Sequence, residues 1–341
     1  MKQAKESLLK SIVQQREMLT GLLYEPLRQL ADVCSRVWGD RAKLEAVLTE
    51  AFPSVPYCKF LYVLDTNAVQ ITANISRDGL VEEHFGRDRS DRPYMSEALL
   101  AMDFHDKNDN QRYQQWSYVS EGVPATDFLL CEAYISLRAL RPSLTAIQFV
   151  RNADGVVLGF IGADFALRDL PQTQQLYEEP GHWRQFNGDP SIRSAVFNQT
   201  RSESKMDRHL DTVISVVEEL ILDHGVYHVI LHFSSSQAII WTMDDPYRNR
   251  LLTMDALIVP DSCMAYPKRP YPDDALVPAQ QVRAVLNNLR ALRFMDEMLY
   301  LRSGALNIFT GMVGLTFSCD GSHYIPYDEF LKMDPAFWVR S

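Results

Sequence analysis

A β-hairpin expected in the middle of the chain constrains the fold more than any other feature. Two apolar, strand-like runs, 143–150 and 156–167, flank the tetrapeptide NADG at 152–155. An Asp-Gly pair between two such runs is a strong hairpin signal, because glycine accepts the positive φ that a tight turn requires. A short turn joins antiparallel strands, so the sequence predicts that these strands belong to an antiparallel sheet.

The surrounding pattern predicts an α+β fold. Residues 6–50 carry apolar side chains three, four or seven positions apart, which predicts a long helix that Pro26 should kink or split. Strands are predicted at 59–64 and 68–75, whereas residues 80–120 carry little strand signal. The order of helix, strands, excursion and further strands favours an antiparallel sheet with helices on one face.

The length of 341 residues suggests two domains. The first predicted domain spans residues 1–170, a polar connector spans 171–205, and the second domain spans 206–341. The second domain repeats the order of helix, strands, helix and strands, although the two halves share no residue-level repeat.

Charge, hydropathy and cysteine content exclude several classes of protein. Asp plus Glu number 44 against 34 for Lys plus Arg, and binding to nucleic-acid phosphates needs a basic surface. No segment reads as a secretory signal or a membrane span. The five cysteines are scattered without a CxxC pair, which favours free thiols in a reducing compartment. The prediction is a cytoplasmic protein that binds neither nucleic acid nor membrane and carries no metal or cofactor.

Two motifs in the first domain carry recognisable chemistry. Residues 86–95 read GRDRSDRPYM and contain Arg92 and Tyr94, and residues 154–170 read DGVVLGFIGADFALRDL and contain Asp164. A guanidinium binds a carboxylate through two parallel hydrogen bonds, and an adjacent aromatic ring can wall a pocket. A carboxylate at the end of a strand complements an ammonium or amide group.

In this order and at this separation, the two motifs resemble those of the Cache (PDC) sensor domains, the PAS-like ligand-binding modules of bacterial receptors. The resemblance covers roughly residues 55–170. It implies an antiparallel PAS/Cache-like sheet with a long N-terminal helix, and the second domain is expected to be a further PAS-like α+β module.

Family members that bind amino acids carry Tyr, four residues, Arg, one residue, Trp-Tyr, a later Tyr and a later Asp. The resemblance therefore implies that Arg92 grips a ligand carboxylate, that Tyr94 and Tyr134 form walls, and that Asp164 meets a positive group. Ser136 follows in the same run as Tyr134 and is a further predicted contact.

Two positions of that pattern differ, and a purely structural interpretation also exists. Arg87 stands where the family has its first Tyr, and Met95 stands at the second aromatic position, so the extra Arg favours a more acidic ligand such as a dicarboxylate. Alternatively, Arg92 pairs with a neighbouring aspartate to tether the loop, and Asp164 caps a helix that begins near Leu167.

The predicted function is a sensor of a small anionic or zwitterionic metabolite that bears a carboxylate, an amino acid or an organic acid. Signalling would pass through partner contacts or through a homodimer formed by the N-terminal helix. An enzyme in the second domain is one alternative, because His232, the serines 234–236 and Asp244 lie close in sequence, although no GxSxG motif is present. A dimeric scaffold without a ligand is the other.

Overall fold

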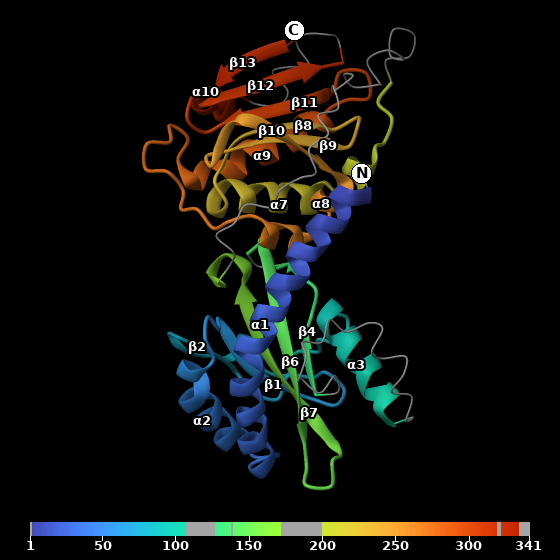
Figure 1. Ribbon diagram of the computed structural model, residues 1–341, viewed down its shortest axis with the longest axis vertical. Helices are drawn as coiled ribbons and strands as arrows, with labels where there is room; N and C mark the ends of the chain where they lie inside the picture. The colour runs from blue at the N-terminus through green and yellow to red at the C-terminus, as the bar shows by residue number, and fades with distance from the viewer. Residues whose placement is uncertain (1, 107–126, 138, 172–199, 319–321, 334–341) are drawn as a thin grey trace. The chain divides into compact units, whose positions relative to one another are not determined.

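The computed structural model describes residues 2–106, 127–137, 139–171, 200–318 and 322–333. The chain has an α+β fold with a long N-terminal helix and two antiparallel sheets, as the sequence predicts (Figure 1). It divides into an N-terminal unit, residues 9–134 and 142–171, and a C-terminal unit, residues 1–8, 135–141 and 172–341. Most of the predicted connector, residues 172–199, lies outside the described residues.

The N-terminal unit is built on a sheet with the strand order β3-β2-β1-β7-β6-β4, in which β5 also pairs with β6. Its strands are β1 (Phe60–Asp65), β2 (Asn74–Ser76), β3 (Gly79–Val81), β4 (Phe128–Leu130), β5 (Tyr134–Ile135), β6 (Pro142–Arg151) and β7 (Val157–Ala166). The predicted hairpin is confirmed, since β6 pairs with β7 and Gly155 adopts a φ of +82° in the turn. The strand predicted at 68–75 is largely wrong, because β2 begins only at Asn74.

The helices described around this sheet are α1 (Lys2–Arg36), α2 (Arg41–Ala51) and α3 (Pro93–Asp106), with short 3₁₀ turns η1 (Phe52–Ser54), η2 (Glu82–His84) and η3 (Leu167–Asp169). The split predicted at Pro26 does not occur, because a buried row of leucines continues on both sides of it. The helix ends instead before Gly39, whose φ is +89°, and the Asp40 side chain then caps α2 by accepting from the backbone N–H of Lys43. None of the described helices combines the length and the apolar character of a membrane span.

Two glycines of the motif allow close packing on both faces of β7. A Cβ atom on Gly159 would lie 2.7 Å from the indole of Trp38, and one on Gly162 would lie 2.3 Å from the ring of Tyr62. Because successive residues of a strand point to opposite faces, Trp38 and Tyr62 cover different faces of the sheet. The face of Tyr62 also carries Tyr94 and Met95 from α3.

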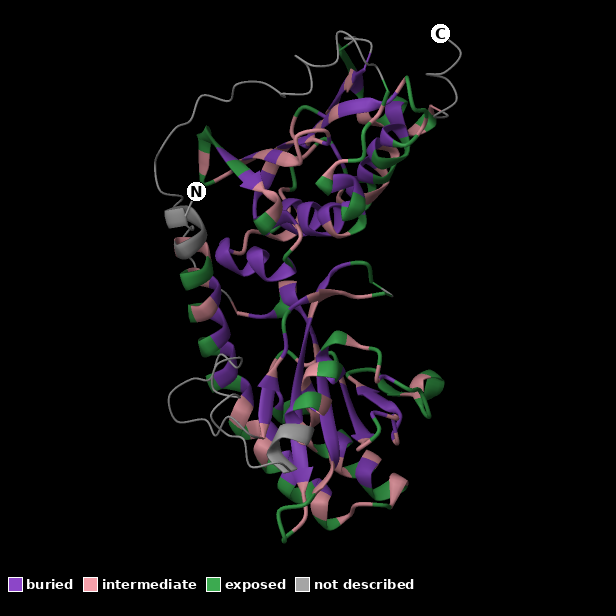
Figure 2. Ribbon diagram, turned by 90° about the vertical axis from the view of Figure 1, so that its right-hand side faces the viewer, coloured by how far each residue is buried: buried purple, intermediate pink, exposed green. Residues whose placement is uncertain are grey.

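The C-terminal unit is built on a sheet with the order β10-β9-β8-β11-β12-β13, in which every neighbouring pair is antiparallel. Its strands are β8 (Val226–His232), β9 (Gln237–Thr242), β10 (Asp245–Thr253), β11 (Leu301–Asn307), β12 (Met312–Phe317) and β13 (Ser322–Pro326). Its helices are α6 (Lys205–Arg208), α7 (Leu210–Asp223), α8 (Met254–Leu257), α9 (Ala279–Arg293) and α10 (Tyr327–Lys332), with a 3₁₀ helix η4 (Pro260–Ala265). Buried residues concentrate on the central strands of each sheet (Figure 2).

The short segment 135–141 groups with the C-terminal unit, although it connects β5 with β6. Its last residue, Arg141, is buried and forms ion pairs with Glu219 and Asp223 of α7. The guanidinium Nε donates to Glu219 Oε2 at 2.6 Å. Arg283 of α9 donates in turn to the backbone carbonyl of Leu140 at 2.6 Å, so that the segment is held at both positions.

Candidate functional site

Asp164 lies near the end of the central strand β7, between Phe60 of β1 and Thr145 of β6. Its Oδ1 atom accepts hydrogen bonds from the hydroxyl of Thr145 at 2.8 Å and from the hydroxyl of Tyr62 at 3.0 Å. Its Oδ2 atom accepts no hydrogen bond within the described part of the chain. The alternative role of Asp164 as a helix cap is wrong, because the turn at Leu167 has no side-chain cap.

Tyr94 and Tyr134 converge on the same place. Their ring centroids lie 5.5 Å apart, and the hydroxyl of Tyr94 lies 3.4 Å from that of Tyr62. The Tyr134 hydroxyl lies 2.9 Å from Thr145 Oγ1. Because Thr145 donates its proton to Asp164, Tyr134 donates to Thr145, which makes a relay of hydroxyls that ends at the carboxylate.

The cation of this cluster is Arg89, which the sequence did not single out. Arg89 is 8% exposed, and its Nη1 donates to the Tyr94 hydroxyl at 3.0 Å. Its Nε and Nη2 donate to Gln70 Oε1 at 2.9 and 2.6 Å, and the guanidinium lies 4.2 Å from the centroid of the Tyr62 ring. Arg89 is thus held by neutral oxygens and an aromatic ring. We call Tyr62, Arg89, Tyr94, Tyr134, Thr145 and Asp164 the polar cluster.

Within the described ranges, the side chains of Arg92 and Ser136 form no hydrogen bond or ion pair with the side chains of the polar cluster, although the backbone N–H of Arg92 donates to the carbonyl of Arg89 at 2.9 Å. Arg92 is partly exposed, and its Nε lies 3.7 Å from Oδ1 of Asp91, whose side chain is 81% exposed. Ser136 accepts from the backbone N–H of Ala139 at 3.3 Å within the segment 135–141. The structure therefore brings together three of the five predicted residues, and the roles of Arg92 and Ser136 stay predictions.

Burial controls the ionisation of the polar cluster. It raises the pKa of Asp164, although the charge of Arg89 and the hydrogen bonds from Thr145 and Tyr62 act in the opposite direction. Burial also raises the pKa values of Tyr62 and Tyr134 well above that of free tyrosine. These hydroxyls therefore remain protonated and act as hydrogen-bond donors at neutral pH. Within the described ranges, no three His, Cys, Asp or Glu side chains converge as metal ligands.

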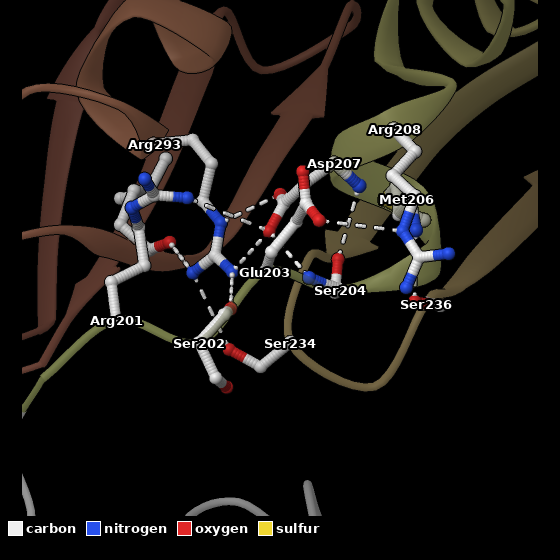
Figure 3. Close-up of polar contacts among 11 residues, drawn as sticks. Arg201, Ser202, Glu203, Ser204, Met206, Asp207, Arg208, Ser234, Ser236 and Arg293 are labelled. Atoms are coloured by element: carbon white, nitrogen blue, oxygen red, sulfur yellow. Dashed lines mark hydrogen bonds and ion pairs between the residues drawn. The ribbon is translucent and has the colours of Figure 1, made fainter.

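Two of the serines 234–236 serve structural contacts (Figure 3), whereas the buried hydroxyl of Ser235 has no hydrogen-bond partner among the described residues. Ser234 Oγ accepts from Arg293 at 3.5 Å, and Ser236 Oγ accepts from the backbone N–H of Met206 at 3.0 Å. Asp244 forms an ion pair with Arg269 at 3.0 Å. These contacts give no support to the hydrolase alternative.

No protein-family model matches the chain, and no curated protein matches it. Similar solved structures include an extracellular ligand binding receptor from Desulfohalobium retbaense, with 13% identity over 46% of this chain and 24% of that chain and a TM-score of 0.33. The ligand-binding domain of the Campylobacter jejuni chemoreceptor Tlp3 in complex with L-norvaline has 15% identity over 48% of this chain and 57% of that chain, with a TM-score of 0.31. A domain of a sensory box/GGDEF family protein from Vibrio parahaemolyticus has 14% identity over 74% of this chain and 94% of that chain, with a TM-score of 0.32. The chain thus covers less than two thirds of the first two, and at these scores the likeness does not by itself identify a function.

Proposed function

We propose that the N-terminal unit is a sensor module that binds a small carboxylate-bearing metabolite between its sheet and α3, and that the ligand is a zwitterion such as an amino acid. The proposal rests on Asp164. Its carboxylate lies in a cluster with three tyrosines, and one of its two oxygens accepts no hydrogen bond from the described residues. A ligand ammonium at Oδ2 would offset the unfavourable burial of this charge.

A carboxylate contact for Arg92 follows from the way the two arginines are engaged. Arg89 already donates to Gln70 and Tyr94, so it acts as a positioning residue that orients the tyrosines. Among the described residues, the side chain of Arg92, which is 21% exposed, has only a long ion pair with the 81% exposed Asp91, and a surface pair of this kind contributes about 0–1 kcal/mol. Exchange of Asp91 for a ligand carboxylate therefore costs little, whereas a charge-assisted, bidentate contact is stronger.

A binding screen tests whether the protein recognises both the carboxylate and the ammonium group of the ligand. Amino acids should raise the melting temperature, whereas matched dicarboxylates without an amine and amines without a carboxylate should give smaller shifts. Asp164→Asn should weaken binding by about ten- to a hundredfold, since a hydrogen bond to a charged group contributes roughly 1.5–3 kcal/mol. Arg92→Ala should weaken it to a similar degree. Isothermal titration calorimetry would give the dissociation constants.

Arg77→Ala is the matched control, because Arg77 is exposed in the turn between β2 and β3. Its affinity should equal that of the unaltered protein. Full retention of affinity in Asp164→Asn would contradict the proposed binding site. Full retention of affinity in Arg92→Ala alone would show that Arg92 does not contact the ligand, whereas the proposed contact of Asp164 would stand.

The ligand-free protein should gain stability from Asp164→Asn at neutral pH. The folded state raises the pKa of Asp164, so this group favours folding at acidic pH and that contribution is lost as the pH rises above the ordinary value of 3.8. At neutral pH the ionised, partly buried carboxylate is a cost that asparagine removes. We expect the melting temperature to rise, and each kcal/mol of cost that asparagine removes should appear as about 2–4 °C in a domain of this size.

Thermal scans of dialysed protein at neutral and acidic pH would measure this difference, which should narrow as the pH falls. Asp169→Asn, at an exposed position, should leave both curves unchanged. A variant that melts below the unaltered protein at neutral pH would show that the Asp164 carboxylate stabilises the empty site.

A further inference from the structure

One face of the six-stranded sheet in the C-terminal unit is covered by helices, and the opposite face is lined by an unusual set of side chains. The helices lie on a single face, because α8 contacts α7, α7 contacts α9, and α9 contacts α10. Gly304 of β11 points toward them, since a Cβ atom there would lie 2.8 Å from Leu289 of α9. Its neighbour Ala305 therefore points to the opposite face, together with Gly314 and Tyr324.

The strand register defines this opposite face, which we call the open face, as three rows that cross all six strands. The first row is Thr253, Gln237, His232, Ser303, Thr316 and Ser322. The middle row is Leu251, Ile239, Ile230, Ala305, Gly314 and Tyr324. The third row is Asn249, Trp241, His228, Asn307, Met312 and Pro326.

The open face carries no Asp, Glu, Lys or Arg in any of its three rows, although these residues make up 23% of the chain. Its middle row is apolar and reaches solvent at its two ends, where Leu251 is 40% and Tyr324 75% exposed, whereas the inner positions are partly or fully buried. In the third row, the rings of His228 and Trp241 stack with centroids 4.6 Å apart. An apolar centre with an uncharged polar border is typical of a buried interface rather than of a solvated sheet face.

We infer that the open face binds the open face of a second copy of this chain. In a twofold dimer each patch meets itself, so its groups must pair with their own kind. The bordering Ser, Thr, Gln and Asn side chains each have a donor and an acceptor and meet this requirement. The chain carries a net charge of −10, so contact between acidic surfaces would be repulsive, whereas the open face brings no like charges together.

The open face suits self-association better than α1, the helix for which the sequence predicts dimerisation. The exposed side of α1 has apolar residues at Met18, Leu22 and Val33. These alternate with charged groups, among which Arg28 pairs with Glu25 at 2.7 Å. Two copies of this helix, which carries six basic and four acidic side chains, would have to rearrange such pairs on contact.

Sedimentation velocity of the full chain at tens of micromolar tests the inference. We expect a species of twice the 39.1 kDa chain mass. Leu251→Asp and Ile230→Asp should each shift it to the monomer and weaken association at least tenfold, because the interface would bury an unpaired carboxylate. Leu251 lies on the edge strand β10 and is already exposed, so its variant should keep the melting temperature and circular dichroism of the unaltered protein.

Two further variants make the test specific. Leu276→Asp, at a 61% exposed position outside the three rows, should remain dimeric, and so should Leu22→Asp on α1. The inference is overturned if the unaltered chain is monomeric, if both open-face variants remain dimeric, or if Leu22→Asp alone produces monomers. A monomeric chain in which Ile230→Asp lowers the melting temperature would also overturn it, since the face would then be covered within one chain.

Discussion

Replacement of Arg293 by methionine will destabilise the C-terminal unit by about 3–5 kcal/mol, the cost of leaving a buried charge without its partner. The Nε and Nη2 atoms of Arg293 donate to the two carboxylate oxygens of Asp207 at 2.8 and 2.7 Å, and both side chains are only 1% exposed (Figure 3). The guanidinium also donates to the backbone carbonyls of Leu301 and Ser202. Methionine keeps much of the volume but leaves the buried Asp207 carboxylate with a distant guanidinium, that of Arg201 at 3.9 Å, and the backbone N–H of Ser204 at 2.9 Å.

Urea unfolding would measure this loss, and two variants serve as controls. Arg290→Met changes the same helix at an exposed pair with Asp211, so it should alter stability by less than about 1 kcal/mol. The double variant Arg293→Met with Asp207→Leu should recover much of the loss, because it removes the charge left behind. A single variant as stable as Arg290→Met would contradict the assignment.

Acidification will destabilise the same unit through His224. Burial lowers the pKa of His224 from 6.5 to about 4, while its Nδ1 lies 3.1 Å from the carbonyl oxygen of Tyr266 and its Nε2 has no hydrogen-bond partner among the described residues. The unfolded chain therefore binds this proton at higher pH than the folded chain does. The stabilising contribution is complete above pH 6.5 and is lost as the pH falls toward 4. At roughly 1.4 kcal/mol per pH unit, the whole change amounts to about 3 kcal/mol.

The pH dependence of urea unfolding would isolate this residue through variants. Between pH 6.5 and 4, His224→Gln should make the free energy of unfolding less dependent on pH, by the equivalent of one bound proton. Comparison with the unaltered protein removes the contribution of the carboxylates, which both proteins share. His209→Gln, at an exposed position, should leave the slope unchanged. An unaltered slope in His224→Gln would mean that the imidazole binds its proton at the same pH in the folded and the unfolded chain.

The sequence predicts those elements whose signals are local. The hairpin of β6 and β7 depends on its turn, and α7 depends on apolar residues at helical spacing. The sequence does not predict strand β10, because Pro246 lies in it, yet β10 is an edge strand with an irregularity between Asp245 and Asn249. At such a position the missing N–H of proline breaks no pairing that the sheet needs.

The candidate site shows a similar division. The motifs locate Tyr94 and Asp164, but they do not distinguish Arg89 from Arg92, because no periodicity governs the directions of side chains in a loop. The buried position of Arg89 follows from its backbone N–H, which donates to the carbonyl of Ala68 at 3.0 Å. Thr145 could be found by counting back from the turn, although an irregularity at Val150 shifts that count.

The position of Arg141 has a consequence for how this chain can be divided. Its two carboxylate partners lie on α7, and the side chain of Glu219 is completely buried. A fragment cut after residue 171 would retain these acids and lose the guanidinium that neutralises them. Truncation, or transfer of the second sheet to another protein, would therefore require a compensating substitution on α7, and we expect the two halves to be maintained together.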